Sequence, residues 1–404
     1  MAVLPEPGPA AFAGIDTHKD THMVALVDAV GREVEIRQFP ADAEGYKAVA
    51  AMIGSTDIPV GVEGTFSYGR GLSDFLVECG YDVFEMIRPK REQRRRGKSD
   101  AIDALAAARN LAAGKGVPRK RLTGAAAELR ILLVLRDRYV KENIGTMNVI
   151  ASMLVTAPEG YRSRFRGLAG DKLIAKLRAS KAKGTLPEAM RSLARRWSQN
   201  KKECQELEER MKGIVLDSFP ALITAKGVGA ISAAKLIVAA GDNPAQLGSD
   251  AAFSMLCGTS PIPVSSGRTD RHRLNRGGDR RANSAIHEIA ETRIRLGGDS
   301  ADYVRRKISE GKTRKEAVRC LCRFIAREMF RLMAGPQDVP DPRALEGRRN
   351  MLGLARGDVA KVLGVNLPKI RNTEKLVSLD SEFIRLYDET LLLVERQEFE
   401  VCSC

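Results

Sequence analysis

The sequence predicts an α/β domain at the N-terminus and an all-α remainder. Two patterns carry this prediction. Short apolar runs alternate with helical segments between residues 11 and 114, and leucine and isoleucine recur at three- and four-residue steps from residue 124 to about residue 215. A chain of 404 residues suggests roughly two or three domains, and 44% hydrophobic residues can fill sizeable cores.

The N-terminal elements follow from the pattern in order. We expect strands at 11–16, 22–28, 33–39, 59–63 and 82–87, and helices at 42–54, 68–79 and from Ser99 to about 113. Ser99 is a suitable N-cap, and Gly114 marks the end of the last helix. Three strands, a helix, a strand, a helix, a strand and a helix describe a meander that leads into an α/β sheet.

Most of the remaining chain is predicted to be helical. We expect a linker at 115–122, an amphipathic helix or coiled coil from 124 and further helix to 217, a helix-hairpin-helix around 227–229, a basic loop from 258 to about 281, and helices at 282–297 and 312–334. The predicted domains are therefore 11–114, 115–217, 218–335, and a C-terminal extension at 336–404 whose role is open.

The net charge is +15 and the sequence pI is about 9.6. This balance favours a polyanionic partner, nucleic acid ahead of a membrane surface, although surplus charge can also serve solubility alone. Seven cysteines without metal-ligand spacing indicate reduced thiols in a cytoplasmic protein. The N-terminus does not read as a signal peptide, and no run reaches about 18 apolar residues, so we expect no membrane span.

Four acidic residues stand at the ends of predicted elements. Asp16 and Glu63 end two strands, and the carboxyl ends of strands are where ligands collect. Asp100 and Asp103 are three residues apart on one helix and so share a face. Four converging carboxylates repel one another unless a cation lies between them, and oxygen ligands suit Mg²⁺ or Mn²⁺. Taken singly, Asp16 could be a turn residue and Glu63 a solvated loop acid. Interaction with the helix dipole is the commoner use of acids placed as Asp100 and Asp103 are.

Three segments carry a family resemblance: GIDTHKDTHMVALVD, GVEGTFSYG and KSDAIDA. They resemble the N-terminal domain of the DEDD transposases, the one-ten family of bacterial insertion sequences. The resemblance implies a RuvC-like, ribonuclease-H-like fold in which Asp16, Glu63, Asp100 and Asp103 bind the metal and are catalytic. We interpret His18 as a local polar contact, because a Mg²⁺ site prefers oxygen.

A basic run precedes the acidic helix. Its sequence is IRPKREQRRRGKSD, with one acid, Glu92, among its cations. Such a run can neutralise several phosphates, although most charge runs are solvated loops. Its position before two predicted metal ligands favours nucleic-acid binding, and the residues concerned are Arg88, Lys90, Arg91, Arg94, Arg95, Arg96 and Lys98.

A second basic segment contains Ser265 and Ser266 in a loop rich in proline and glycine. The arginines around them, which we predict to bind nucleic acid, are Arg268, Arg271, Arg273, Arg276, Arg280 and Arg281. A serine hydroxyl needs a base or a metal to become a nucleophile, and His272 is the nearest candidate base. Taken by itself, a serine pair in a basic loop is more often a phosphate cradle or a plain loop than a nucleophile. Gly227 and Gly229 upstream fit either phosphate contact or helix packing.

This segment resembles the C-terminal domain of the same family. Gly258, Pro261, Ser266 and Gly267 match the family register, with Gly277 and Gly278 as later glycines, so Ser266 rather than Ser265 is implied as the nucleophile. The resemblance covers residues 11–335. It implies a recombinase in the bacterial cytoplasm at the nucleoid, with donor and target duplex DNA and a structured bridge RNA as partners. It also implies a homo-oligomer, dimer to tetramer, in which the acids of one subunit work with the serine of another to form a covalent serine–DNA link.

Two other functions remain open from the residues alone. A metal-dependent nuclease or junction resolvase would use the acids, with the serine loop only gripping phosphate. A non-catalytic nucleic-acid-binding protein would need one of the four acids to be missing, and none is.

Overall fold

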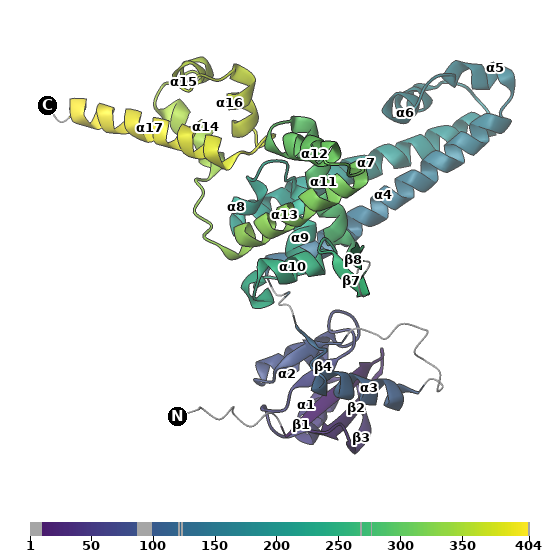
Figure 1. Cartoon of the computed structure of the whole chain (residues 1–404). Helices are drawn as coiled ribbons and strands as arrows, with labels where there is room; N and C mark the ends of the chain where they lie inside the picture. Colours follow the sequence, from purple (N-terminus) through teal and green to yellow (C-terminus); the bar gives the residue numbers. More distant parts are fainter. Residues whose placement is uncertain are drawn as a thin grey trace. The chain divides into compact units, whose positions relative to one another are not determined.

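The protein is described here by a computed structural model. It describes residues 10–86, 99–119, 122, 124–266, 269–275 and 277–402. The chain forms two compact units, Met1–Lys120 and Arg121–Cys404 (Figure 1).

The first unit contains a six-stranded sheet in the order β3-β2-β1-β4-β5-β6. Its strands are β1 (Ala11–Thr17), β2 (Thr21–Asp28), β3 (Glu33–Pro40), β4 (Val60–Val62), β5 (Val83–Glu85) and β6 (Val117–Pro118). Strands β1 to β3 form the expected antiparallel meander, and β4 and β5 continue the sheet in parallel with β1. The five expected strands are confirmed to within two residues at each end. Strand β6 corrects the expected linker, because that segment pairs with β5.

Helices cover both faces of this sheet. They are α1 (Ala43–Ile53), α2 (Arg70–Glu78) and α3 (Asp100–Ala112). Ala13 and Ile15 of β1 share a core with α1 and α2, whereas Phe12 packs in a separate cluster with Ala107 and Leu111 of α3. The alternation of β1 therefore decides which helix covers which face.

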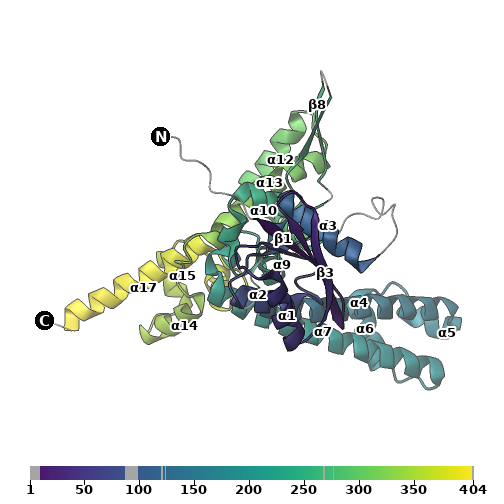
Figure 2. The ribbon, with the colours of Figure 1, turned by 90° about the horizontal axis from the view of Figure 1, so that it is seen from below.

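The second unit begins with two long helices, α4 (Ala125–Thr156) and α7 (Thr185–Ser218). They lie side by side in both views (Figures 1 and 2). Arg136 pairs with Glu208 across them at 2.8 Å. The connection holds α5 (Glu159–Arg162), η2 (Ser163–Phe165) and α6 (Gly170–Ala179), which pack on the ends of the long helices. The expected long helix is confirmed.

The next segment is a helical cluster. It contains α8 (Pro220–Ile223), α9 (Ala230–Ala240), η3 (Pro244–Leu247), α10 (Asp250–Leu256), β7 (Ile262–Ser266), β8 (Thr269–Arg273), α11 (Arg280–Leu296), α12 (Asp299–Ser309) and α13 (Arg314–Ala334). The segment expected to be a loop contains an antiparallel hairpin, β7 and β8. Helix α12 was not expected; Gly297 and Gly298 separate it from α11 with backbone φ of 79° and 76°, a region that favours glycine.

The C-terminal segment has a core of its own. It consists of α14 (Pro342–Met351), α15 (Arg356–Val362), α16 (Leu367–Glu374) and α17 (Ser381–Cys402). Leu345, Ile370, Ile384 and Tyr387 are fully buried within it. This C-terminal lobe, residues 342–402, is thus a packed helical unit, which the weak pattern of the sequence did not establish. None of the helices in the described part of the chain is long and apolar enough to span a membrane.

Candidate functional site

Strand pairing brings two of the predicted acids to one edge of the sheet. Because β1 and β4 are parallel, with Ile15 opposite Val62, the residues that follow the pair are Asp16 and Glu63. The Glu63 amide donates to the Ile15 carbonyl at 2.9 Å, which ties the two strand ends together. Each acidic residue is only 4% exposed. Burial of this kind is costly for a carboxylate unless positive charge or hydrogen bonds compensate it.

Helix α3 brings a third acid to the same edge. The helix can approach β1 because residue 14 is glycine: a Cβ there would lie 2.2 Å from the Ala108 amide nitrogen. Asp100 is the first residue of α3, and Ser99 precedes it in extended backbone. Ser99 occupies the expected N-cap position, but among the described residues its side chain makes no capping hydrogen bond.

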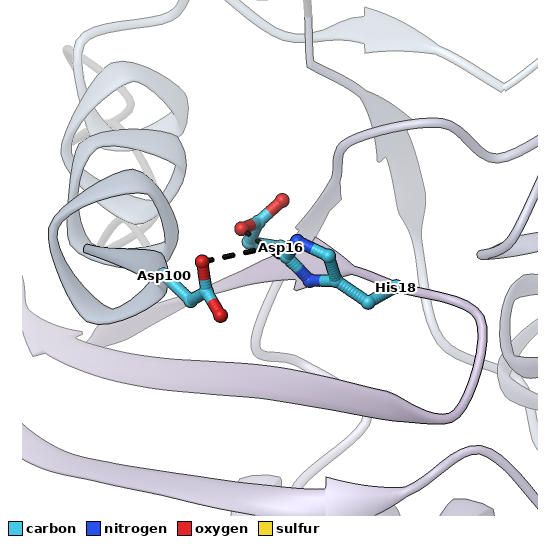
Figure 3. A group of neighbouring side chains, drawn as sticks. All are labelled: Asp16, His18 and Asp100. Carbon is cyan, nitrogen blue, oxygen red and sulfur yellow. Dashed lines mark ion pairs between the residues drawn. The ribbon is translucent and has the colours of Figure 1, made fainter. Parts of the chain in front are cut away.

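His18 lies between the acids of strand and helix. Its Nδ1 is 3.8 Å from Asp16 Oδ2, and its Nε2 is 3.8 Å from Asp100 Oδ1 (Figure 3). One ligand atom from each of these three residues lies within 4.8 Å of the others. Asp16, His18 and Asp100, which we call the acidic cluster, therefore form a group that could hold a divalent cation, with two hard carboxylate ligands and one imidazole. The sequence interpretation treated His18 only as a local polar contact.

The other two predicted acids lie near this cluster in the fold without joining it. Among the described side chains, neither Glu63 nor Asp103 belongs to the group within 4.8 Å. Glu63 follows the neighbouring strand, and Asp103 lies in the first turn of α3, half-buried. The structure thus brings Asp16 and Asp100 together, and it places Glu63 after the neighbouring strand β4 and Asp103 on the same helix as Asp100.

Glu85 was missed by the sequence interpretation. It ends β5, the next parallel strand, opposite Val62. Its carboxylate accepts hydrogen bonds from the amides of Gly64 and Thr65 at 3.2 and 3.0 Å. Glu85 is therefore a positioning residue that fixes the loop directly after Glu63. An acid at a third strand end was the signal that could have identified it.

The serine segment forms the end of the β7–β8 hairpin. Ser266 is the last residue of β7 and pairs with Thr269, and Ser265 pairs with Asp270. At the base of the hairpin, Gly258 and Gly278 approach so closely that a Cβ on Gly278 would lie 2.4 Å from the Gly258 amide nitrogen. This contact explains why residue 278 is glycine, whereas Gly258 has a backbone φ of 66°, a region that favours glycine.

Several predicted site residues lie outside the described residues: Arg88, Lys90, Arg91, Arg94, Arg95, Arg96, Lys98, Gly267, Arg268 and Arg276. The backbones of Arg271 and His272 lie in β8.

A cavity of about 990 Å³ adjoins the hairpin base, between residues 258–261 and the helices α11, α12 and α13. We call it the basic cavity, because six cationic side chains line it: Arg273, Arg280, Lys307, Lys312, Arg319 and Arg323. Glu316, an acid in its lining, accepts hydrogen bonds from the Thr313 amide and hydroxyl at the start of α13. Arg273 and Arg280 were predicted from sequence. Arg281 instead pairs with Asp137 of α4 at 2.9 Å.

Family models match both the segment that contains the acidic cluster and the segment that contains the serine hairpin. A DEDD transposase model of the IS110 type matches residues 13–157, and a model described as Transposase IS116/IS110/IS902 family matches residues 220–305. Together they cover more than half of the chain. The chain belongs to the IS110 family of transposases. No curated protein matches it. As a transposase of insertion sequences, it is an enzyme that acts on DNA.

Two aromatic rings and a histidine complete the basic cavity of this transposase. The rings of Tyr303 and Phe324 pack edge to face, with their centroids 5.6 Å apart, and Phe324 is 56% exposed. Burial, and then the charge of Arg319, lowers the pKa of His287, whose Nδ1 lies 3.6 Å from Cys322 Sγ. Cations can bind phosphate oxygens and an exposed ring can stack on a base. The sequence interpretation missed all three residues, because only helix packing brings them together.

The Gly227 turn of the transposase is explained by packing. Gly227 has a backbone φ of 77°, and a Cβ there would lie 2.9 Å from Arg293 Cγ. Arg293 Nε also donates to the Lys226 carbonyl at 2.7 Å. Of the two readings left open by the sequence, these contacts favour a turn that seats α11 against α9.

Proposed function

We propose that this transposase cleaves and exchanges DNA strands through a metal-binding carboxylate site and a serine nucleophile, guided by a structured bridge RNA. The observation that carries the proposal is the acidic cluster at the carboxyl end of β1, beside Glu63. The strand order of the first unit supports a ribonuclease-H-like, RuvC-like fold, since an antiparallel meander is followed by parallel strands that carry acids at their ends.

The residues at this edge fit Mg²⁺ or Mn²⁺. Asp16 and Asp100 would supply oxygen ligands, and His18 a nitrogen that Mn²⁺ tolerates better than Mg²⁺ does. Glu63 follows the neighbouring strand, and Asp103 lies on the same helix as Asp100. When bound, such ions stabilise the negative charge that builds up at a phosphate under attack. The chain itself contributes a rigid frame, because Glu85 and Gly14 hold the loop and the helix that carry these ligands.

Ser266 is the proposed nucleophile. Its Oγ forms a bond to the scissile phosphorus while the bond from phosphorus to a sugar oxygen breaks. The serine hydroxyl loses one proton and the departing sugar oxygen gains one. Attack by the sugar hydroxyl of another strand on the phosphoserine reverses these changes and releases the serine. The phosphodiester energy is conserved, so strands can be exchanged without a further reactant.

The partners follow from charge. The basic cavity beside the hairpin favours the backbones of donor DNA, target DNA and bridge RNA, which we propose as ligands of Arg273 and Arg280. The paired helices α4 and α7 offer a surface for assembly into a dimer or tetramer.

The test is an adduct assay with the bridge RNA, duplex substrate and Mg²⁺. The parent should form a protein–DNA adduct that survives denaturation. Ser266→Ala and Asp16→Asn should abolish it, whereas Ser265→Ala should retain it. Asp82→Asn is the control for charge, since Asp82 is an exposed acid before β5, at the opposite end of the parallel strands.

Two results would contradict this proposal in different ways. Cleavage that needs Asp16 but not Ser266, without an adduct, would identify a hydrolytic nuclease or junction resolvase. Independently of activity, Mn²⁺ titration followed by electron paramagnetic resonance should show binding that Asp16→Asn weakens and Asp82→Asn leaves unchanged. Equal Mn²⁺ binding by all three proteins would reject the acidic cluster as a metal site.

A further inference from the structure

The C-terminal lobe contains two short helices joined by a tight turn. Helix α15 ends at Val362, and α16 begins at Leu367. The turn is closed by the Val365 amide, which donates to the Ala360 carbonyl at 3.0 Å. Gly364 has a backbone φ of 62°, the left-handed region that favours glycine after a helix. Asn366 then caps α16, since its side chain accepts from the Lys369 amide at 3.0 Å.

The inner faces of this pair build one core. Val359 and Ala360 of α15 and Ile370 and Thr373 of α16 are buried. Small Ala360 lies on the buried face of the first helix, where a larger side chain would hold the second helix away. Two short packed helices, a turn containing glycine and buried apolar residues on both helices are the features of a helix-turn-helix.

A buried ion-pair network holds the second helix in place. Glu374, at the end of α16, is bound by Arg349 of α14 at 2.6 Å and by Arg356 of α15 at 2.5 Å. The Tyr387 hydroxyl of α17 donates to the same carboxylate at 2.8 Å. All four helices of the lobe thus meet at one carboxylate, so the outer face of α16 is presented on a rigid support.

The outer face of the pair is cationic. Lys361, Arg371 and Lys375 are exposed, and no ion pair is recorded for them within the described residues. Residues 356–375 contain two acids. Glu374 is buried in the network above, and Asp358 is exposed at the start of α15, where its carboxylate accepts from the Ala355 amide at 2.9 Å; the three exposed cations therefore outnumber the one exposed acid. Leu367, in the first turn of α16, is also exposed. Exposed cations beside an apolar side chain suit phosphates and the thymine methyl group in a major groove.

We propose that residues 356–375 form a helix-turn-helix that binds duplex DNA, with α16 as the helix that enters the major groove. The lobe lies outside both segments matched by the family models. At this site the protein itself would recognise a DNA sequence, separately from any base pairing between DNA and the proposed guide RNA. The proposal does not depend on the proposed serine and metal chemistry.

The proposal is tested by selecting, from a mixed pool, the DNA duplexes that the full-length protein binds. A pool of random-sequence 30-base-pair duplexes is enriched for binding without RNA and without divalent ions, so that neither guide pairing nor cleavage contributes. The parent should enrich a sequence motif. Arg371→Glu should lower the affinity for the enriched duplex at least tenfold, because it places a negative charge against the DNA. Arg396→Glu is the matched control, an exposed cation on α17 of the same lobe, and should stay within twofold of the parent.

The outcomes separate this inference from the rest. The helix-turn-helix proposal would be overturned if the parent enriched no motif, or if Arg371→Glu and Arg396→Glu lost affinity equally. A face that binds an acidic protein instead of DNA would enrich no motif. Circular dichroism should show that both variants keep the parent's helical content, since both side chains are exposed. If the parent protein formed no serine adduct but still enriched a DNA motif, the proposed chemistry would be rejected and the helix-turn-helix proposal would stand.

Discussion

The acidic cluster and the basic cavity differ in how the chain assembles them. The acids stand at the ends of a strand and a helix that pack directly on one another; Asp16 is buried, and the Asp100 side chain is 48% exposed. The cations of the cavity come from the hairpin base and three helices, and most are exposed. A buried carboxylate must be compensated within the fold, whereas an exposed guanidinium remains solvated until a phosphate arrives. The strand end that carries Asp16 is therefore suited to holding a ligand rigidly, and the basic cavity to reversible contact with a polyanion.

The largest expected effect tests the rigidity of the acidic site. Gly14→Ala would place a methyl group against the backbone of α3, so the helix must move away from β1. We expect a loss of about 1–3 kcal/mol in the free energy of unfolding, together with weaker Mn²⁺ binding, measured by urea denaturation and metal titration. Gly145→Ala is the control, because Gly145 is exposed in α4 with open space around it. That change should add stability, by up to about 1 kcal/mol. If both variants behaved alike, close packing of α3 on β1 would not be what positions Asp100.

A smaller effect sharpens the description of the basic cavity. Arg319→Ala should weaken DNA binding about equally for unrelated sequences, and should reduce the slope of log affinity against log salt by about one. Arg314→Ala is the matched control on the same helix, because Arg314 is already paired with Glu291 at 2.6 Å. Fluorescence anisotropy at several salt concentrations measures both slopes. An unchanged slope in Arg319→Ala would mean that the cavity does not contact phosphate.

The smallest effect concerns pH. Burial, and then the charge of His18, lowers the pKa of His22 below its ordinary value of 6.5, so the folded protein binds a proton at His22 less readily than the unfolded chain does. The unfolded chain takes up a proton near pH 6.5 and the folded chain does so only at lower pH. Stability is therefore complete above about pH 6.5 and falls as the pH drops below it. His287, whose pKa burial also lowers, acts in the same direction.

Thermal unfolding between pH 7.5 and pH 5 measures this dependence. His22→Phe should reduce the fall in the unfolding midpoint, because the ring that stacks on Tyr46 is kept and its titration is removed. An undiminished fall in that variant would assign the pH dependence to other groups. His287→Phe, made separately, would show how much of the remainder arises in the second unit.

Elements whose apolar residues follow a clear local pattern could be predicted from the sequence. The apolar run of β1 that ends in an acid, and the helical pattern that begins after Ser99, placed Asp16 and Asp100 at the ends of their elements. The hairpin β7–β8 was missed, since proline, glycine and arginine obscure strand alternation there. The packing of the C-terminal lobe was not predicted either, because a weak helical pattern does not show which helices will share a core.

By itself the sequence determined the sheet, the long helices, the strand-end acids and the family, because strand pairing and helix periodicity depend on local patterns. Only the tertiary structure decided that His18 joins Asp16 and Asp100, that Glu85 braces the loop after Glu63, and that Arg319 and Phe324 share a cavity. It also decided that four C-terminal helices meet at Glu374. Such contacts join residues on separate elements, and no periodicity in a chain records which surfaces will pack together.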